Sequence, residues 1–405
     1  MSVVAFHRGN GVIALNVLTA ALRADPRTRD LPIVFARDRD AVAAAAGPGA
    51  LVAWSFYSLD APRVFEDLAW LRARTEGLHV AGGVHATAEP RATLEAGFDL
   101  VALGEGERTI VDLALADDPT TVKGLGRLVD GVYRDTGAGE RVALDEFPAF
   151  NAPDRKWNAI EITRGCVYAC SFCQTPFMFK ARFRHRSVDN VRDHVRVMRR
   201  ERLRYLRFLT PTSLSYGATG TEPDLAAVEA LLAACREELG PDGKIFFGTF
   251  PSEIRPEHVT PSALAILRKY VDNDNLVIGG QSGSEKVLAA SRRDHTVDDV
   301  ERAVRYAVEA GFSPNVDFLF GLPGEGEEDV AASVGLMERL VAAGARIHTH
   351  AFLPLPGTPL RGAPAAVVPE LAVRALGRLE AKGSAYGVWR KQVEASGQLV
   401  ELRRR

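Results

Sequence analysis

Short apolar runs alternate with longer amphipathic segments along two separate stretches of this chain. In the first stretch the strand-like runs are Val3–Phe6, Pro32–Phe35, Leu51–Ser55, Leu78–Ala81 and Leu100–Leu103. Segments with helical periodicity, such as Ile13–Arg23 and Ala61–Arg74, lie between them. Repeated strand–helix units of this kind build a parallel sheet with helices on both faces. The pattern therefore predicts a doubly wound α/β sheet, in which ligands bind at the carboxyl ends of the strands.

The second stretch, from about residue 158 to residue 356, repeats the alternation with six strand-like runs. These runs are Asn158–Thr163, Tyr205–Thr210, Lys244–Phe250, Leu276–Gly280, Asn315–Phe320 and Ile347–Leu353. Helical segments such as Val188–Arg200 and Glu327–Ala343 separate them. Six units fall short of the eight that close a full (β/α)8 barrel. We therefore expect a partial (β/α)6 barrel, with an open α/β sheet as the alternative.

These two stretches set the expected domain boundaries. Residues 1–120 are expected to form the doubly wound domain, and residues 156–362 the partial barrel. Residues 121–155 are expected to be a linker with a small hairpin, whose strands flank the glycines within Val132–Ala143. Residues 363–405 are expected to be a helical tail that becomes irregular toward its three terminal arginines.

The composition excludes several classes of protein. With 46% hydrophobic and 25% charged residues, the chain is typical of a soluble globular protein. Its net charge of −2 gives no global basic signal for nucleic acid. No apolar stretch reaches the roughly 20 residues that span a bilayer, and Met1–His7 is not typical of a signal peptide. We expect a cytoplasmic protein without nucleic-acid or membrane partners.

Three of the four cysteines stand within eight positions, at Cys166, Cys170 and Cys173. This spacing, C-x-x-x-C-x-x-C, does not resemble a disulfide framework and indicates thiolates that bind metal in a reducing compartment. Zinc would need a fourth ligand, and no second cysteine pair exists in the chain. An iron–sulfur cluster held by three thiolates keeps one iron open, whereas four thiolates close the site. The triplet follows the first strand of the expected barrel, on the face where barrel enzymes have their active sites.

The motif Cys166-Val-Tyr-Ala-Cys-Ser-Phe-Cys173, placed after the first strand of a sixfold βα domain, resembles the radical S-adenosylmethionine (SAM) superfamily. The resemblance implies that Cys166, Cys170 and Cys173 hold a 4Fe–4S cluster whose open iron binds SAM. It also implies that Phe172 packs beside the adenine. In such enzymes an electron from a donor such as flavodoxin or ferredoxin is used to cleave SAM, while the protein positions the cofactors and excludes water.

Loops after the later strands extend the resemblance. Many family members have Gly-Gly-Glu after the second strand to bind the methionine amino group, and this chain departs from that pattern. The SAM-binding candidates implied at the strand ends are Thr210, Thr212, Ser213, Ser252, Glu253, Gln281 and Ser282. Helix capping explains Ser252 and Glu253 equally well.

Two further features of the second stretch leave alternatives open. His348, His350 and Phe352 share one strand face by two-residue periodicity, so a substrate contact and a structural, hydrogen-bonded role are both possible for the histidines. Cys235 stands in an amphipathic segment and is expected to be a buried structural cysteine.

The doubly wound domain before the barrel resembles the cobalamin-binding subgroup of the superfamily. The subgroup's fingerprint is Asp-x-His-x-x-Gly, then Ser-x-Leu, then Gly-Gly; here Ala5 and Asn10 replace Asp and Gly, and Tyr57 replaces Leu. The cobalamin-binding candidates that the resemblance implies are His7, Ser55, Gly82, Gly83, Gly104 and Glu105. A histidine that ligates a metal through one ring nitrogen is normally oriented by a hydrogen-bond acceptor on the other. The missing aspartate leaves two arrangements open, with His7 as cobalt ligand or with no histidine ligand.

Together these features predict a cobalamin-dependent radical methyltransferase, or a related radical enzyme, acting on a small metabolite. A first alternative keeps the cluster and SAM without cobalamin, and includes transfer of a 3-amino-3-carboxypropyl group. A second alternative is a non-enzymatic iron–sulfur sensor or electron carrier, which an open coordination site does not favour.

Overall fold

The computed structural model describes residues 1–404 of the chain. Internal contacts divide the chain into two compact units, Met1–Ala159 and Ile160–Arg405. Both units are α/β and are built mainly on parallel strands, so the predicted fold class is confirmed.

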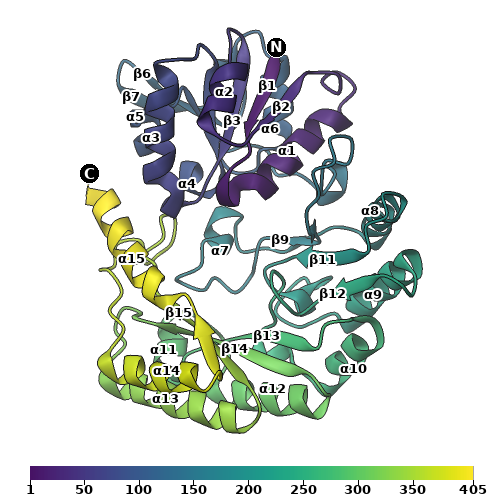
Figure 1. Ribbon diagram of the computed structural model, residues 1–405, viewed down its shortest axis with the longest axis vertical. Coiled ribbons are helices and arrows are strands. Elements are labelled where there is room, and N and C mark those ends of the chain that lie inside the picture. The colour runs from purple at the N-terminus through teal and green to yellow at the C-terminus, as the bar shows by residue number, and fades with distance from the viewer. Residues whose placement is uncertain (405) are drawn as a thin grey trace. The chain divides into compact units, whose positions relative to one another are not determined.

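A seven-stranded sheet in the order β2-β1-β3-β4-β5-β6-β7 forms the centre of the first unit (Figure 1). Its strands are β1 (Ser2–Phe6), β2 (Ile33–Ala36), β3 (Ala50–Ser55), β4 (Leu78–Gly82), β5 (Leu100–Ala102), β6 (Leu125–Val129) and β7 (Val132–Asp135). The first five strands are parallel and coincide with the five predicted runs. Every residue of β3 is buried, as expected for a central strand covered on both faces.

The connections of the first unit supply its helices. They are α1 (Val12–Ala24), α2 (Arg39–Ala45), α3 (Ala61–Arg72), α4 (Gly83–Ala88), α5 (Pro90–Glu95) and α6 (Glu107–Leu115), with single turns at Gly9–Gly11, Ser58–Asp60, Pro119–Thr121 and Leu144–Glu146. α1 packs against α6 and α2 against α3. Leu15 and Leu22 of α1 join Leu51 and Ile110 in the core beneath them.

The segment that we expected to be a linker instead extends this sheet. β6 pairs antiparallel with β5, and β7 pairs antiparallel with β6. The hairpin expected within Val132–Ala143 is wrong, because its turn lies one strand earlier, at Asp130 and Gly131. Both residues have positive φ, 52° and 74°, which a two-residue hairpin turn requires.

The second unit contains two parallel sheets that hydrogen bonds join into one array. The strands are β8 (Ile160–Glu161), β11 (Tyr205–Leu209) and β12 (Lys244–Phe246) in one sheet, and β13 (Asn275–Gln281), β14 (Ser313–Phe320), β15 (Arg346–Ala351) and β16 (Ala385–Gly387) in the other. Val277 N donates to Gly248 O at 2.8 Å, and Ile254 pairs with Ile278. The strands from β8 to β15 therefore follow one another in chain order, as expected for the partial (β/α)6 barrel.

Most helices of the second unit lie on the outer side of this curved array, whereas the short helix at residues 175–178 does not (Figure 1). The helices of this unit are α7 (Thr175–Met178), α8 (Val188–Arg200), α9 (Leu225–Leu239), α10 (Pro261–Tyr270), α11 (Glu285–Ala290), α12 (Val297–Glu309), α13 (Glu327–Ala342), α14 (Glu370–Ala381) and α15 (Trp389–Arg404), with single turns at Ser213–Ser215 and Pro256–His258. Val316, Phe318 and Phe320 of β14 are buried in a core with residues of α12 and α13. Residues between them, such as Asp317, consequently face the inner, concave side.

The C-terminal tail is more ordered than the sequence predicts. β16 pairs parallel with β15, so the expectation of an irregular segment after the helix is wrong. Its three residues are too few to give a period-two signal. α15 then runs through Arg404, while Arg405 lies outside the described residues.

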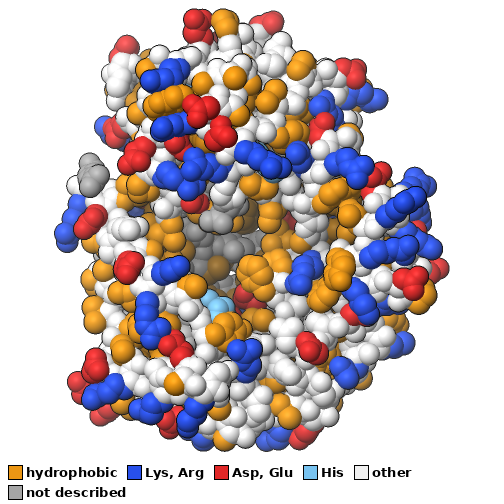
Figure 2. Space-filling view, in the orientation of Figure 1, with side chains coloured by type: hydrophobic (Ala, Val, Ile, Leu, Met, Phe, Trp, Pro, Cys, Tyr) orange, Lys and Arg blue, Asp and Glu red, His pale blue; other side chains and the backbone are white. Residues whose placement is uncertain are grey.

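Basic side chains gather over α8 and are interspersed with acidic ones (Figure 2). Arg192 pairs with Glu237 at 3.3 Å, and Arg196 pairs with Glu238 at 3.0 Å. These ion pairs between α8 and α9 partly neutralise this basic face. Among the described helices, none combines the length and the apolar character that a membrane crossing requires.

Candidate functional site

The cysteine loop leaves the antiparallel pair β9 (Thr163–Arg164) and β10 (Arg184–His185). Gly165, with φ of +83°, makes the turn into the loop, and a Cβ there would lie 2.1 Å from Arg182 O. Only glycine fits this close approach. The loop then closes a small turn, in which Cys173 N donates to Cys170 O at 3.0 Å.

The three thiols of the triplet are free and lie largely out of solvent. They pack with Tyr168 and Phe183 in one small cluster. Burial raises the pKa of the Cys166 thiol to about 11, and repulsion from the other two thiols adds to the rise. Burial likewise raises the pKa of Cys173. The three cysteines lie in one cluster, and three free thiols there fit the ligand set of an open iron–sulfur cluster.

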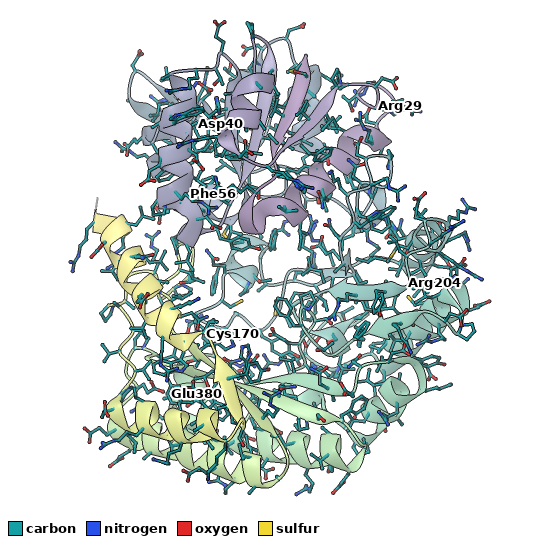
Figure 3. The ribbon with its side chains drawn as sticks, viewed as in Figure 1. Arg29, Asp40, Phe56, Cys170, Arg204 and Glu380 are labelled. Atoms are coloured by element: carbon teal, nitrogen blue, oxygen red, sulfur yellow. The ribbon has the colours of Figure 1, made fainter. Side chains whose placement is uncertain are left out.

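A buried arginine faces the middle thiol. Arg293 Nη1 donates to Cys170 Sγ at 3.4 Å, and Nη2 donates to Gly279 O at 2.7 Å. The Arg293 side chain is fully buried, and the thiols lie among the charges that raise its pKa. Buried cations require a compensating negative charge, which cysteine thiolates would supply. Cys170 lies on the inner side of the strand array (Figure 3).

The Tyr168 side chain holds the cysteine loop against neighbouring loops of the barrel. Its hydroxyl donates to Thr221 O at 2.8 Å and lies 2.9 Å from His258 Nε2. The guanidinium of Arg255 stacks on the Tyr168 ring, 3.5 Å from its centroid. The tyrosine, rather than a cysteine, thus anchors the loop to the turn before α10.

Phe172 and the threonines after β11 have different surroundings. Phe172 is half-buried and packs against both the cysteine cluster and the main core of the barrel. Thr210 Oγ1 donates to Thr212 O at 3.1 Å. Thr212 Oγ1 is buried and finds no partner among the described residues. A buried hydroxyl without a partner indicates a missing ligand or water.

Ser213 and Ser252 are engaged with backbone and do not face an open space. Ser213 Oγ donates to Ser252 O at 2.6 Å and to Glu253 O at 2.9 Å, while Ser252 Oγ donates to Thr249 O. These bonds tie the loop after β11 to the loop after β12. Both hydroxyls donate to backbone carbonyls, and Ser252, for which helix capping was the alternative, is not the N-cap of the helical turns that follow.

Glu253 belongs instead to a group of charged side chains inside the barrel. Burial raises the pKa of its carboxyl to about 7; repulsion from Asp317 raises it further, while His350 and Arg293 lower it. Glu253 is thus within electrostatic reach of both Arg293, which contacts the cysteine loop, and the residues of β14 and β15.

The side chains of Gln281 and Ser282, which are adjacent in sequence, contact different parts of the barrel. Gln281 has a φ of 70° at the irregularity between β13 and β14, and its amide lies against Gly279, as does Arg293. Ser282 Oγ lies 3.2 Å from Ser333 Oγ of α13 and is fully buried. The glutamine is near the site, whereas the serine holds its loop to α13.

Two of the residues noted on β15 meet Asp317 on the concave face. His348 Nδ1 lies 2.8 Å from Asp317 Oδ1, and His350 Nε2 lies 3.2 Å from His348 Nδ1. Phe352 was expected on the same face but follows the end of β15 and is buried in the core. That expectation was wrong because the strand pleat ends before Phe352.

Sequence reasoning did not single out Asp317, Arg293 or Arg255. Asp317 had a readable signal, a lone carboxylate in the middle of an apolar strand. The two arginines stand in irregular loops, where no periodicity separates a buried arginine from the exposed arginines elsewhere in the chain.

His7 in the first unit contacts an acceptor that does not follow from the fingerprint. His7 Nε2 lies 2.7 Å from Asn16 Oδ1, and Asn16 Nδ2 donates to Asn158 Oδ1 at 2.8 Å. The amide of Asn16 therefore takes the place of the missing aspartate as hydrogen-bond acceptor. Burial lowers the pKa of His7. Because Nε2 is engaged, only Nδ1 is left for a ligand.

The glycines and the serine at the carboxyl edge of this sheet pack on one another. A Cβ on Gly11 would lie 1.7 Å from Ser55 O, and a Cβ on Gly83, whose φ is +84°, would lie 2.7 Å from Ser55 Oγ. Ser55 is accordingly buried. Gly82 has only ordinary contacts around its Cβ position, the nearest at 3.6 Å.

Gly104 and Glu105 have different surroundings. Gly104 has a φ of +84° with no atom within 4 Å of its Cβ position, and its N donates to Thr87 Oγ1 at 3.1 Å. Glu105 is buried and accepts from Val142 N at 3.3 Å, which ties residues 140–143 to the sheet. Glu105 therefore has a structural role.

The sequence model of the radical SAM superfamily matches residues 160–337. A tRNA-2-methylthio-N(6)-dimethylallyladenosine synthase of Pelobacter propionicus is 28% identical over 310 residues, 73% of this chain and 64% of that protein. The chain spans less than two thirds of the length of the first curated relatives it matches.

Two solved structures share the fold. The radical SAM methyltransferase TsrM from Kitasatospora setae, with cobalamin and a [4Fe-4S] cluster bound, has a TM-score of 0.69 at 20% identity, covering 89% of this chain and 77% of that one. The cobalamin-dependent radical SAM enzyme OxsB, with aqua-cobalamin bound, has a TM-score of 0.66 at 16% identity, covering 84% and 52%.

Proposed function

Because residues 160–337 belong to the radical SAM superfamily, we propose that this radical SAM enzyme is a cobalamin-dependent methyltransferase that acts on a small molecule. The observation that carries the proposal is the triplet of free thiols, with Cys170 buried and Cys166 and Cys173 half-buried, and with Arg293 Nη1 on Cys170. The fold that the chain shares with TsrM and OxsB, over both of its units, supports the cobalamin part.

The cysteine loop has what a cluster site needs from the protein. Cys166, Cys170 and Cys173 would hold a 4Fe–4S cluster, which when bound supplies the electron that cleaves SAM. Arg293 donates toward one ligand sulfur, and such a hydrogen bond favours the reduced cluster by stabilising its extra negative charge. Phe172 covers the loop on its apolar side and keeps water out.

SAM itself would be held by residues of the strand-end loops. Thr212 presents a buried hydroxyl without a partner, and Gln281 lies beside Gly279 near Arg293. A neutral Glu253 can donate a hydrogen bond and an ionised one can accept from an ammonium group; its pKa of about 7 allows both near neutral pH. We assign no contact to Ser213, Ser252 or Ser282, whose hydroxyls are already bonded.

The first unit fits cobalamin through its strand-end loops rather than through a histidine. Gly104 has an open Cβ position that lets a ligand approach the backbone, and Gly82 has only ordinary contacts there. His7 keeps only Nδ1 for a ligand, because its Nε2 lies 2.7 Å from Asn16 Oδ1. Cobalamin would supply the methyl group, and we derive no ligation by His7.

Cobalt retention and product analysis test the proposal. The full chain is reconstituted anaerobically with iron, sulfide and hydroxocobalamin, desalted, and assayed with SAM and a reductant. We expect about one cobalt per chain, and 5′-deoxyadenosine among the products. Loss of all cobalt on desalting would reject the cobalamin part. Predominant methylthioadenosine would instead identify 3-amino-3-carboxypropyl transfer, the alternative that the unusual Thr210–Ser213 loop favours.

A further inference from the structure

A three-residue polar cluster inside the barrel is not used by the proposed function. It consists of Asp317 on β14 and of His348 and His350 on β15. Asp317 and His348 are direct partners in the register of the two strands, so the sheet itself fixes their spacing. Asp317 is 7% exposed, and each histidine side chain is 27% exposed, which leaves their tips open toward the inside of the barrel.

The geometry points to a binding site for one divalent transition-metal ion, held by Asp317 Oδ1, His348 Nδ1 and His350 Nε2. The three atoms are separated by 2.8, 3.2 and 3.8 Å. A circle through all three has a radius of about 1.9 Å, close to the zinc–nitrogen and zinc–oxygen distances of about 2.0–2.2 Å. An ion almost in their plane would therefore contact all three atoms at once.

A hydrogen bond from either imidazole to Asp317 leaves the close approach of the two ring nitrogens, 3.2 Å apart, without a hydrogen bond of its own. His348 Nδ1 faces both a carboxylate oxygen and the ring nitrogen of His350, and one proton on Nδ1 serves only one of them well. A cation satisfies all three lone pairs together. Two imidazoles and one carboxylate on one side of an ion, with the other positions open, form a set typical of zinc and ferrous iron.

Contacts around the cluster hold the two rings in place. His348 stacks on Tyr386 of β16, with ring centroids 4.6 Å apart and an angle of 13° between planes. Tyr386 Oη donates to Asn315 Oδ1 at 3.2 Å. His350 Nδ1 lies 3.3 Å from Gln392 Nε2 of α15, while Gln392 Oε1 accepts from Ala351 N at 3.0 Å. The stacking contact fixes the orientation of the His348 ring, whereas Gln392 places an amide nitrogen rather than an acceptor on His350.

The contact between Gln392 and His350 provides a second test of the proposed metal site. If Nε2 of His350 binds an ion, its Nδ1 must carry the proton and needs an acceptor. The amide nitrogen of Gln392 is a donor, whereas a carboxylate in the same place accepts from both Nδ1–H and Ala351 N–H. The substitution Gln392→Glu should therefore retain or strengthen metal binding.

Zinc binding to the intact chain tests this inference without SAM or substrate. Untagged protein carrying its cluster is titrated anaerobically with Zn²⁺ against a chromophoric chelator, and zinc and iron are counted after gel filtration. We expect about one zinc per chain at unchanged iron content. His350→Ala and Asp317→Asn should weaken zinc binding about 100-fold or more. His194→Ala, on α8 away from the cluster, should leave it unchanged.

The Gln392→Glu variant keeps the inference testable if the two ligand variants fold poorly. Zinc affinity equal to or above that of the wild type supports the site, and a loss of zinc overturns it. Absence of zinc from the wild type, or equal zinc in wild type and His350→Ala, also overturns it and leaves a purely hydrogen-bonded cluster. Because zinc is measured without reaction, these outcomes are independent of whether the proposed methyl transfer is found.

Discussion

In both units the carboxyl ends of the parallel strands are followed by glycine-rich, polar loops. The contacts of the side chains found there differ between the two units. At the edge of the first unit, Gly11 and Gly83 pack against Ser55, and Glu105 binds backbone of the same unit. On the inner side of the barrel, by contrast, free thiols, a buried arginine and ionisable side chains converge.

This difference shows that a glycine-rich strand end does not by itself indicate a ligand site. Glycine is required for a tight turn against neighbouring backbone as much as for a ligand's approach. Charged groups buried together are harder to explain by packing, because each carries a desolvation cost. The barrel therefore supports a reactive site directly, whereas the first unit supports a binding role mainly by its fold.

The largest expected effect comes from the cysteine triplet. Replacing Cys170 with Ala should abolish the cluster and with it all SAM cleavage, because two thiolates and no third ligand remain on the loop. Cys235→Ala is the matched control, since Cys235 is buried in α9 and should change only stability, by about 1 kcal/mol. Iron and sulfide per chain measure both; a Cys170→Ala protein with a full cluster would contradict the site.

Loss of the arginine that faces Cys170 should have the next largest effect. Arg293→Met removes the hydrogen bonds to Cys170 Sγ and Gly279 O. Without that charge, the reduction potential of the cluster should become more negative and SAM cleavage with a weak donor should slow. The control is Arg302→Met, because Arg302 pairs with Asp298 on the outside of α12. An unchanged potential in Arg293→Met would show that the contact is only structural.

In the first unit, the same logic predicts a stability effect of moderate size. Gly83→Ala forces a left-handed residue and places Cβ against Ser55 Oγ, so we expect a loss of about 2–3 kcal/mol in the free energy of unfolding. Gly137→Ala has the same φ, +84°, with no atom near its Cβ position, and should cost only about 1 kcal/mol. Urea unfolding distinguishes them; equal losses would argue against the close approach.

The smallest effect concerns a glutamate that ends the loop after β14. Burial raises the pKa of Glu325 from 4.5 to about 7, although Gly321 N donates to its carboxylate at 2.7 Å. Because the folded state holds this proton more tightly than the unfolded state, its contribution to stability is fully present below about pH 4.5 and is lost as pH rises to about 7.

Glu325→Gln should remove that pH dependence. The variant should gain on the order of 2 kcal/mol relative to the wild type at pH 8 and nothing at pH 4.5. Thermal unfolding followed across this range checks the slope. A variant whose stability profile runs parallel to that of the wild type would show that Glu325 is not buried as described.

Most of the fold could be predicted from the sequence, since period-two and helical patterns identify all strands from β1 to β5 and the six main barrel strands. The hairpin was predicted within residues 121–155 but misplaced, because its turn lies at Asp130–Gly131 and not at the later glycines. β16 was missed because three residues carry no period.

The sequence predicts only the part of the site whose residues are close together in the chain. The cysteine triplet is contiguous, so its geometry follows from one loop. Asp317, His348 and His350 come together from two separate strands, and only the strand order and register of the barrel decide that they meet. The hydroxyls of Ser213 and Ser282 failed as candidates because neighbouring loops already use them.

The central claim is that three thiolates hold a cluster with one iron open to SAM. Electron paramagnetic resonance of the reduced, reconstituted protein with and without SAM tests this most directly, since a ligand on the open iron changes the spectrum of the cluster. We predict a distinct spectrum when SAM is added to the wild-type protein. An identical spectrum with and without SAM would contradict the account.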